Sequence, residues 1–135
     1  MSARRKARKR ALDFLYEADI RGATALSLLS ERPAEELSQG DYVRELLVGV
    51  EEHLSKIDEL ITTYAQGWDM DRLPAVDRNI LRLGIYEILW CKDLDDAIAI
   101  DEALNLAREL STDDSAAYIH GVLGRISNIK ESLAI

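Results

Sequence analysis

Apolar residues recur three and four positions apart along almost the whole chain, and this spacing limits the fold more than any other feature of the sequence. It is the period of an amphipathic helix, whereas a half-buried strand alternates at every second residue. Only two prolines and seven glycines interrupt the 135 residues, and no segment has a convincing strand pattern. We therefore predict an all-α fold.

Cap and breaker residues divide this pattern into about seven predicted helices. Gly22 ends the first, Ser55 is placed to cap the fourth, and Pro74 opens the fifth. The expected ranges are about 2–21, 24–30, 41–54, 55–65, 74–90, 95–110 and 115–129. The fifth helix is apolar around much of its circumference and should lie centrally.

A faint internal echo, in which a few residues recur at offsets of 70 or 72 positions, suggests two related helical halves. We expect one domain made of two small packed bundles, about 1–67 and about 74–135. An alternative use of the fifth helix is open, because the face formed by Leu81, Ile85 and Ile88 could instead form a dimer that resists salt.

The net charge of −8 is the sum of two unlike parts. The first ten residues carry a charge of +6, and the other 125 carry −14. The six cations are Arg4, Arg5, Lys6, Arg8, Lys9 and Arg10. A short basic arm on an acidic body can bind a phosphate backbone while the body repels it elsewhere. The alternative is an ordinary mobile terminus.

The cations of this arm surround its helical axis, since successive residues are about 100° apart. Its first two turns therefore have no uncharged face for the body, and we expect the arm to protrude and to be ordered mainly by a polyanion. The arm holds no aromatic residue that could stack on a base. Tyr118, on the rim of the last helix's apolar face, is the leading candidate, with packing at the core edge as the alternative.

Catalytic and metal sites find little support in the residue inventory. One cysteine, Cys91, and two histidines form no zinc motif, and no glycine-rich loop offers donors to a nucleotide phosphate. We expect no cofactor, no metal and no enzymatic activity. Glu87 projects from the apolar arc of the fifth helix, so we expect a buried structural carboxylate there. No apolar run reaches membrane length and the N-terminus is charged, so we expect a cytoplasmic protein.

Three blocks of residues resemble the family of the bacterial transcription antitermination factor N-utilization substance B, or NusB. The blocks are 3–8 with Leu15 and Tyr16, then 77–83 with Tyr86 and Glu87, then 100–107 with Ser115 and 121–123. They keep their order and spacing over nearly the whole chain, and the second and third blocks together are specific.

The resemblance implies a non-catalytic all-α protein that binds the single-stranded boxA element of ribosomal RNA leaders. It implies a small-subunit ribosomal protein, acting as NusE, as partner, and a role in helping RNA polymerase read through terminators. By position, Arg4, Arg5, Lys6 and Arg8 match the family's RNA-binding arm, and Asp114, Ser115 and Tyr118 match a second RNA patch. Tyr16 and Asp77 match positions that face the ribosomal protein.

Two departures from the family pattern fall in the second patch. Ala117 stands where relatives can have a basic residue, which weakens the expected RNA contact, and His120 stands where asparagine is usual. On a helical projection His120 points away from the core.

Two alternatives to the antitermination function are open at this stage. A similar helical domain is an RNA-binding appendage of some RNA cytosine methyltransferases. The chain could also be a self-associating scaffold, such as a homodimer, whose arm docks on the acidic surface of a second copy instead of RNA.

Overall fold

The computed structural model describes residues 2–32, 40–65, 67 and 72–135. All regular elements in these ranges are helical, which confirms the all-α prediction. The helices are α1 (Ala3–Arg21), α2 (Ala25–Ser30), α3 (Gly40–Glu52), α4 (Leu54–Tyr64), α5 (Ala75–Trp90), α6 (Asp96–Leu110) and α7 (Asp113–Ile129), followed by a short 3₁₀ turn at Lys130–Ser132. None of the helices described has the length and apolar character that a membrane span requires.

Three side-chain caps and one glycine set four of the helix ends near the expected positions. The hydroxyls of Ser2, Thr24 and Thr112 each accept a hydrogen bond from the backbone N–H three residues ahead, at 3.0–3.2 Å. Gly22 ends α1 with φ of 68°, a left-handed conformation that favours glycine.

The expected cap of α4 is wrong. The helix begins at Leu54, one residue before Ser55, and the residue that precedes it, His53, makes no side-chain cap bond. His53 instead stacks on the ring of Trp90 at 3.9 Å between ring centroids, so its position is set by packing against α5.

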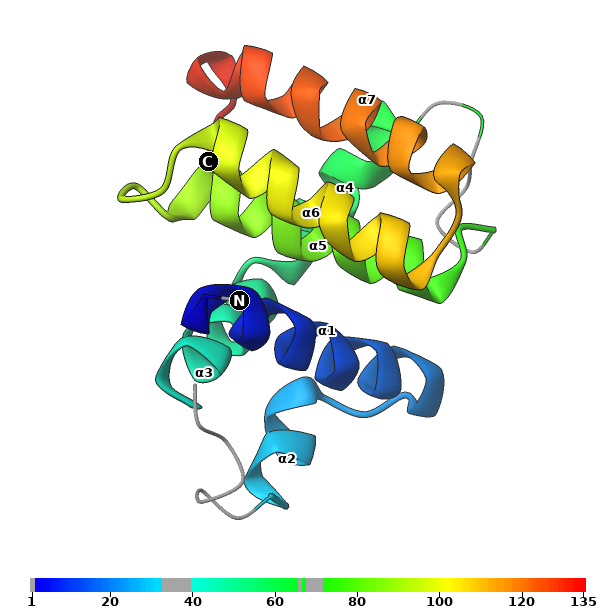
Figure 1. Ribbon diagram of the computed structural model, residues 1–135. Helices are drawn as coiled ribbons and strands as arrows, with labels where there is room; N and C mark the ends of the chain where they lie inside the picture. Colours follow the sequence, from blue (N-terminus) through cyan, green and yellow to red (C-terminus); the bar gives the residue numbers. More distant parts are fainter. Residues whose placement is uncertain (1, 33–39, 66, 68–71) are drawn as a thin grey trace.

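Helix α5 lies at the centre, as its apolar circumference predicted. It packs against α1, α3, α4, α6 and α7. Figure 1 shows α1, α2 and α3 below it and α6 and α7 on its other side. Leu81 and Ile85 are fully buried and Ile88 is 3% exposed. The proposed dimer through these three residues is therefore wrong, because they form the interior of the protein's own core.

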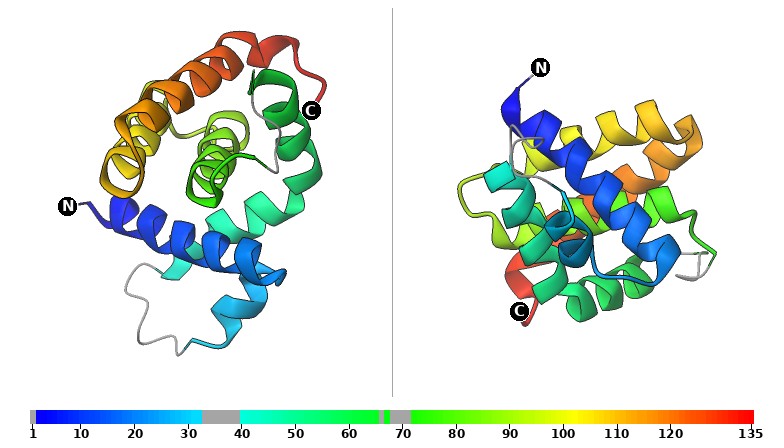
Figure 2. Two further views of the ribbon diagram at one scale, coloured as in Figure 1. Left: turned by 90° about the vertical axis from the view of Figure 1, so that its right-hand side faces the viewer. Right: turned by 90° about the horizontal axis from the view of Figure 1, so that it is seen from below.

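Helix α4, which the sequence predicts in the first bundle, lies where the two predicted bundles meet. It follows α3 after a single residue and contacts it, and it also packs against α5 and α7. In Figure 2 it lies beside the C-terminal end of α7. The buried apolar residues of all seven helices form one continuous core.

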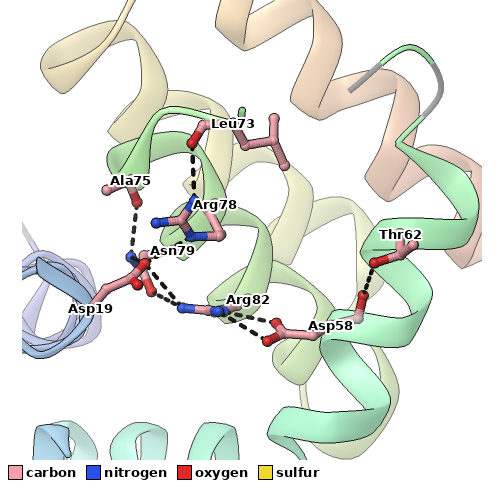
Figure 3. Close-up of polar contacts among 8 residues, drawn as sticks. All are labelled: Asp19, Asp58, Thr62, Leu73, Ala75, Arg78, Asn79 and Arg82. Carbon is pink, nitrogen blue, oxygen red and sulfur yellow. Dashed lines mark hydrogen bonds and ion pairs between the residues drawn. The ribbon is translucent and has the colours of Figure 1, made fainter. Parts of the chain in front are cut away.

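A polar network joins α1, α4 and α5 across the two halves (Figure 3). One carboxylate oxygen of Asp19 accepts hydrogen bonds from Arg78 at 2.8 Å, Asn79 at 2.9 Å and Arg82 at 3.2 Å. Arg82 also donates two bonds to Asp58, at 2.8 and 3.0 Å. Burial alone would raise the pKa of Asp19, but the hydrogen bonds from Arg78 and Asn79, together with the positive charges of Arg82 and Arg78, lower it overall.

Candidate nucleic-acid interface

The basic arm does not protrude. Helix α1 is regular from Ala3 onward and its first turns lie against the body of the protein, with Ala7 and Ala11 fully buried. Our expectation of an arm ordered by a polyanion is therefore wrong. The physical reason is that acidic side chains from α5, α6 and the turn between them face the cations, so the ions are neutralised where the helix docks.

Arg8 is the one arm cation that the protein buries. Its side chain is 4% exposed, and its Nε donates to both oxygens of Glu87 at 2.8 and 2.9 Å. The hydroxyl of Tyr42 donates to the same carboxylate at 2.6 Å. Glu87 is thus the buried structural carboxylate that the sequence predicted. Arg8, which the resemblance assigned to the RNA-binding arm, therefore has a structural role, because its guanidinium is turned away from solvent.

Three more arm cations form ion pairs at the surface. Arg4 Nη2 lies 3.2 Å from Asp93, and Lys9 Nζ lies 2.6 Å from Glu109. The hydrogen bond to Glu109 raises the pKa of Lys9.

Arg5 makes the most extensive of these surface contacts. Its Nε and Nη2 each donate to Glu102 at 3.0 Å. The side chains of Arg4, Arg5 and Lys9 are 42–45% exposed, so each cation is paired and still accessible.

The remaining two cations are Lys6 and Arg10. Lys6 is exposed, and Arg10 is half-buried with its guanidinium 5.7 Å from the ring centroid of Phe14. Neither forms an ion pair within the ranges that the structure describes. The accessible face of the arm therefore consists of two cations without an ion pair and three paired ones.

Tyr118 lines a groove of about 660 Å³ on the outer side of α7. Tyr64, the last residue of α4, lies in the same groove, with the guanidinium of Arg125 5.7 Å from its ring centroid. Gly121 and Gly124 form part of its floor, and a Cβ at either would meet nothing within 4 Å. Burial is the main cause that raises the pKa of Tyr118. Both tyrosine rings are partly buried and pack against the edge of the core, as the alternative for Tyr118 expected. The surface that they leave beside a cation and open backbone suits an unstacked base.

The sequence missed Tyr64 and Arg125 as groove residues. Arg125 is on the same helix as Tyr118, at a spacing of seven residues, which could have suggested a shared face. Tyr64 comes from a separate helix, and no sequence signal places it there. His120 is exposed and lies in the groove, which agrees with its predicted outward direction.

Asp77 and Ser115, which the resemblance assigned to different partners, are hydrogen-bonded to each other. Ser115 Oγ donates to Asp77 at 2.7 Å, and Ser111 Oγ donates to the other carboxylate oxygen at 2.6 Å. Asp77 is 4% exposed, so its carboxylate fixes the turn between α6 and α7 and is not offered at the surface. Asp114 is exposed on the first turn of α7.

Tyr16 is 41% exposed on the outer face of α1, as a partner-binding residue requires. Ile20, one turn further along the same helix, is 61% exposed and was not identified from the sequence. A tyrosine and an isoleucine four residues apart form a small apolar surface on one helix face.

Metal and thiol chemistry have no site among the described residues. No group of three or more His, Cys, Asp or Glu side chains there is arranged to hold a metal ion. Cys91 is buried, and burial raises its pKa to about 11, which leaves the thiol protonated at neutral pH.

The profile of the NusB family matches residues 5–128. Among curated proteins, the chain is 51% identical to the transcription antitermination protein NusB of Nocardioides sp., over 99% of this chain and 100% of that protein. It is 50% identical to the protein of the same name from Salinispora arenicola, over 94% of this chain and 96% of that protein. Both relatives are named transcription antitermination proteins, which agrees with the prediction that the chain is not an enzyme.

Two solved structures agree with this assignment. NusB from T. maritima superimposes with a TM-score of 0.86 at 33% identity, covering 98% of this chain and 99% of that one. A chain from a complex of the antitermination factors NusB and NusE with double-stranded RNA gives 0.81 at 26% identity, covering 95% and 98%. The comparisons of sequence and of fold agree, and the chain belongs to the NusB family of transcription antitermination proteins.

Proposed function

We propose that this protein is an antitermination factor that binds boxA-type single-stranded leader RNA of ribosomal RNA operons, together with a small-subunit ribosomal protein acting as NusE. The observation that carries the proposal is the group of accessible cations on the first turns of α1, namely Arg4, Arg5, Lys6, Lys9 and Arg10. Arginine and lysine at this density on an otherwise acidic protein favour a phosphate backbone as ligand.

The groove that holds Tyr64 and Tyr118 supplies the second half of the proposed RNA site. Phosphate contacts position a nucleic acid without reading its sequence, so selectivity needs a surface that contacts bases. Lys9 reaches Glu109 in the last turn of α6, and α7 begins after a turn of two residues. The arm therefore ends close to the start of the helix that carries the groove, and Asp114 and Ser115 lie between them.

The apolar surface of Tyr16 and Ile20 is the proposed contact for the ribosomal protein. Outside the first ten residues the chain carries a charge of −14, which complements a basic partner. Asp77 contributes indirectly in this proposal, by fixing the turn between α6 and α7. We propose that the pair then joins the antitermination complex of RNA polymerase.

The alternatives receive less support from these observations. Three of the cations that arm-mediated self-association would use, Arg4, Arg5 and Lys9, are paired with acids of the same chain. The curated relatives named above are about as long as this chain and are antitermination proteins, which favours that role over a methyltransferase appendage. Light scattering at low and high salt tests whether a homodimer forms.

The decisive experiment is a binding titration with a boxA-like leader RNA, a scrambled single strand and a duplex, each with and without the ribosomal protein. We expect the boxA-like strand to bind most tightly and the ribosomal protein to increase the difference. Equal affinity for all three RNAs in every condition would refute the proposal, because it would show binding to any polyanion.

A further inference from the structure

We infer that Asp93, Glu102 and Glu109 compete with RNA phosphate for the arm and thereby set its affinity for RNA. The inference rests on the proposed binding of RNA by the first turns of α1. The sequence alone did not connect these acidic residues with the arm.

The geometry of the pair between Arg5 and Glu102 supports this role. A carboxylate presents two oxygens to a guanidinium in the same planar, two-bond arrangement that a phosphate uses. Arg5 makes this contact with Glu102 through Nε and Nη2, both at 3.0 Å. The Nε and Nη2 atoms of Arg5, which would bind a phosphate, therefore already bind the carboxylate of Glu102.

Exposure to solvent distinguishes the surface pairs of the arm from the buried pair of Arg8 and Glu87. Arg8 and Glu87 are 4% and 2% exposed, so RNA has no access to that guanidinium. Arg4 and Lys9 are 45% and 42% exposed, and their acids Asp93 and Glu109 are 71% and 49% exposed. RNA can reach these two cations and displace their partners without unfolding the helix.

Replacing the carboxylate by a phosphate should cost little free energy, and its effect on RNA affinity should be measurable. An exposed ion pair changes an equilibrium by at most about five-fold. Each phosphate contact on single-stranded RNA releases counterions from the RNA. A carboxylate that is displaced from the arm takes up a cation from solution, and this uptake offsets part of that release. Each paired cation should therefore add less than the usual contribution of about 0.7 to the slope of log K against log salt.

The test uses two variants and two matched controls in the full-length chain. D93N and E109Q each remove an acid that pairs with the arm. E59Q and E17Q remove acids of similar exposure, 67% and 41%, which pair with Lys56 and Arg21 outside the arm. Each of the four variants changes the net charge by one and leaves one Arg or Lys side chain without its acidic partner. The variants therefore differ in whether that side chain belongs to the arm. Glu102 is left intact, because it also lies 3.9 Å from Arg8.

Affinities for poly(U) and for the boxA-like RNA are measured by fluorescence anisotropy over a series of salt concentrations. We expect D93N and E109Q to bind both RNAs about two- to five-fold more tightly at low salt, with steeper salt slopes. The controls should change far less, because their acids pair with Lys56 and Arg21 and not with a cation of the arm. If D93N and E109Q match E59Q and E17Q, the acids do not compete with RNA.

The proposed function and this inference fail in different ways. Equal binding of boxA-like and scrambled RNA by the unaltered chain would remove the proposed target, while the poly(U) comparison would still decide whether the acids compete. Tight, selective boxA binding with no gain in the two variants would overturn the inference alone. Absence of poly(U) binding in every variant would overturn it as well, because the freed cations would then not bind phosphate.

Discussion

The guanidinium of Arg8 and the carboxylate of Glu87 lie 2.8 Å apart in the interior, although 79 positions separate them in the sequence. This pair fixes the first turns of α1 on α5 and so determines which side of the arm faces solvent. A buried ion pair adds little net stability compared with apolar residues, but removing one partner leaves an uncompensated charge.

Replacing one member of this pair should destabilise the fold strongly. We expect E87Q or R8M to lower the free energy of unfolding by about 3–5 kcal/mol in urea denaturation. The double variant R8M/E87M should lose much less than the sum of R8M and E87M, because no lone charge remains. Additive losses would show that the two charges do not depend on each other.

Local features of the fold could be predicted because they depend on neighbouring residues. The spacing of apolar residues predicted the seven helices, and Gly22 and Pro74 correctly marked the end of α1 and the start of α5. Ser55 failed as a cap because the stacking of His53 on Trp90, a contact between distant residues, places the start of α4.

The site was predicted less completely because it depends on long-range pairing. The sequence identified Glu87 as an acid in need of a partner and the arm as six cations without acids. It could not join them, since nothing local indicates that α1 runs along α5 and α6. For the same reason the sequence did not predict that Tyr64 lies in the groove or that Ser115 contacts Asp77.

The stability of the network around Asp19 should depend on pH in a defined direction. The pKa of Asp19 is lowered in the folded protein, so the charged carboxylate stabilises the fold at pH values above its ordinary pKa of about 3.9. This contribution is lost as the pH falls through the lowered pKa, because both the folded and the unfolded forms are then protonated. We expect the stability difference between the unaltered chain and D19N to be largest near neutral pH and to shrink below about pH 4. A difference that stays constant down to pH 2 would contradict this account.

Gly49 should tolerate no side chain. A Cβ at this position would lie 2.1 Å from the ring of Tyr86, where α3 crosses α5. We expect G49A to lower the free energy of unfolding by about 1–3 kcal/mol, since the ring has to move within a packed core. G121A is the matched control, because its Cβ meets nothing within 4 Å, and alanine in an exposed helix should add about 0.5–1 kcal/mol. Equal effects of the two variants in thermal unfolding would refute the steric explanation.

The arm and the groove should contribute to RNA binding in ways that salt can separate. R5A removes a cation that meets phosphate, so it should weaken the binding of boxA-like and scrambled RNA alike and flatten the salt slope by up to about 0.7. Y118A removes a ring without charge, so it should leave the slope unchanged and weaken binding of the boxA-like strand by about five- to 100-fold, the effect of one lost base stack. Titrations of both variants with both RNAs at four salt concentrations provide the measurement. A change of slope in Y118A, or loss of selectivity in R5A alone, would mean that the two surfaces have been assigned the wrong roles.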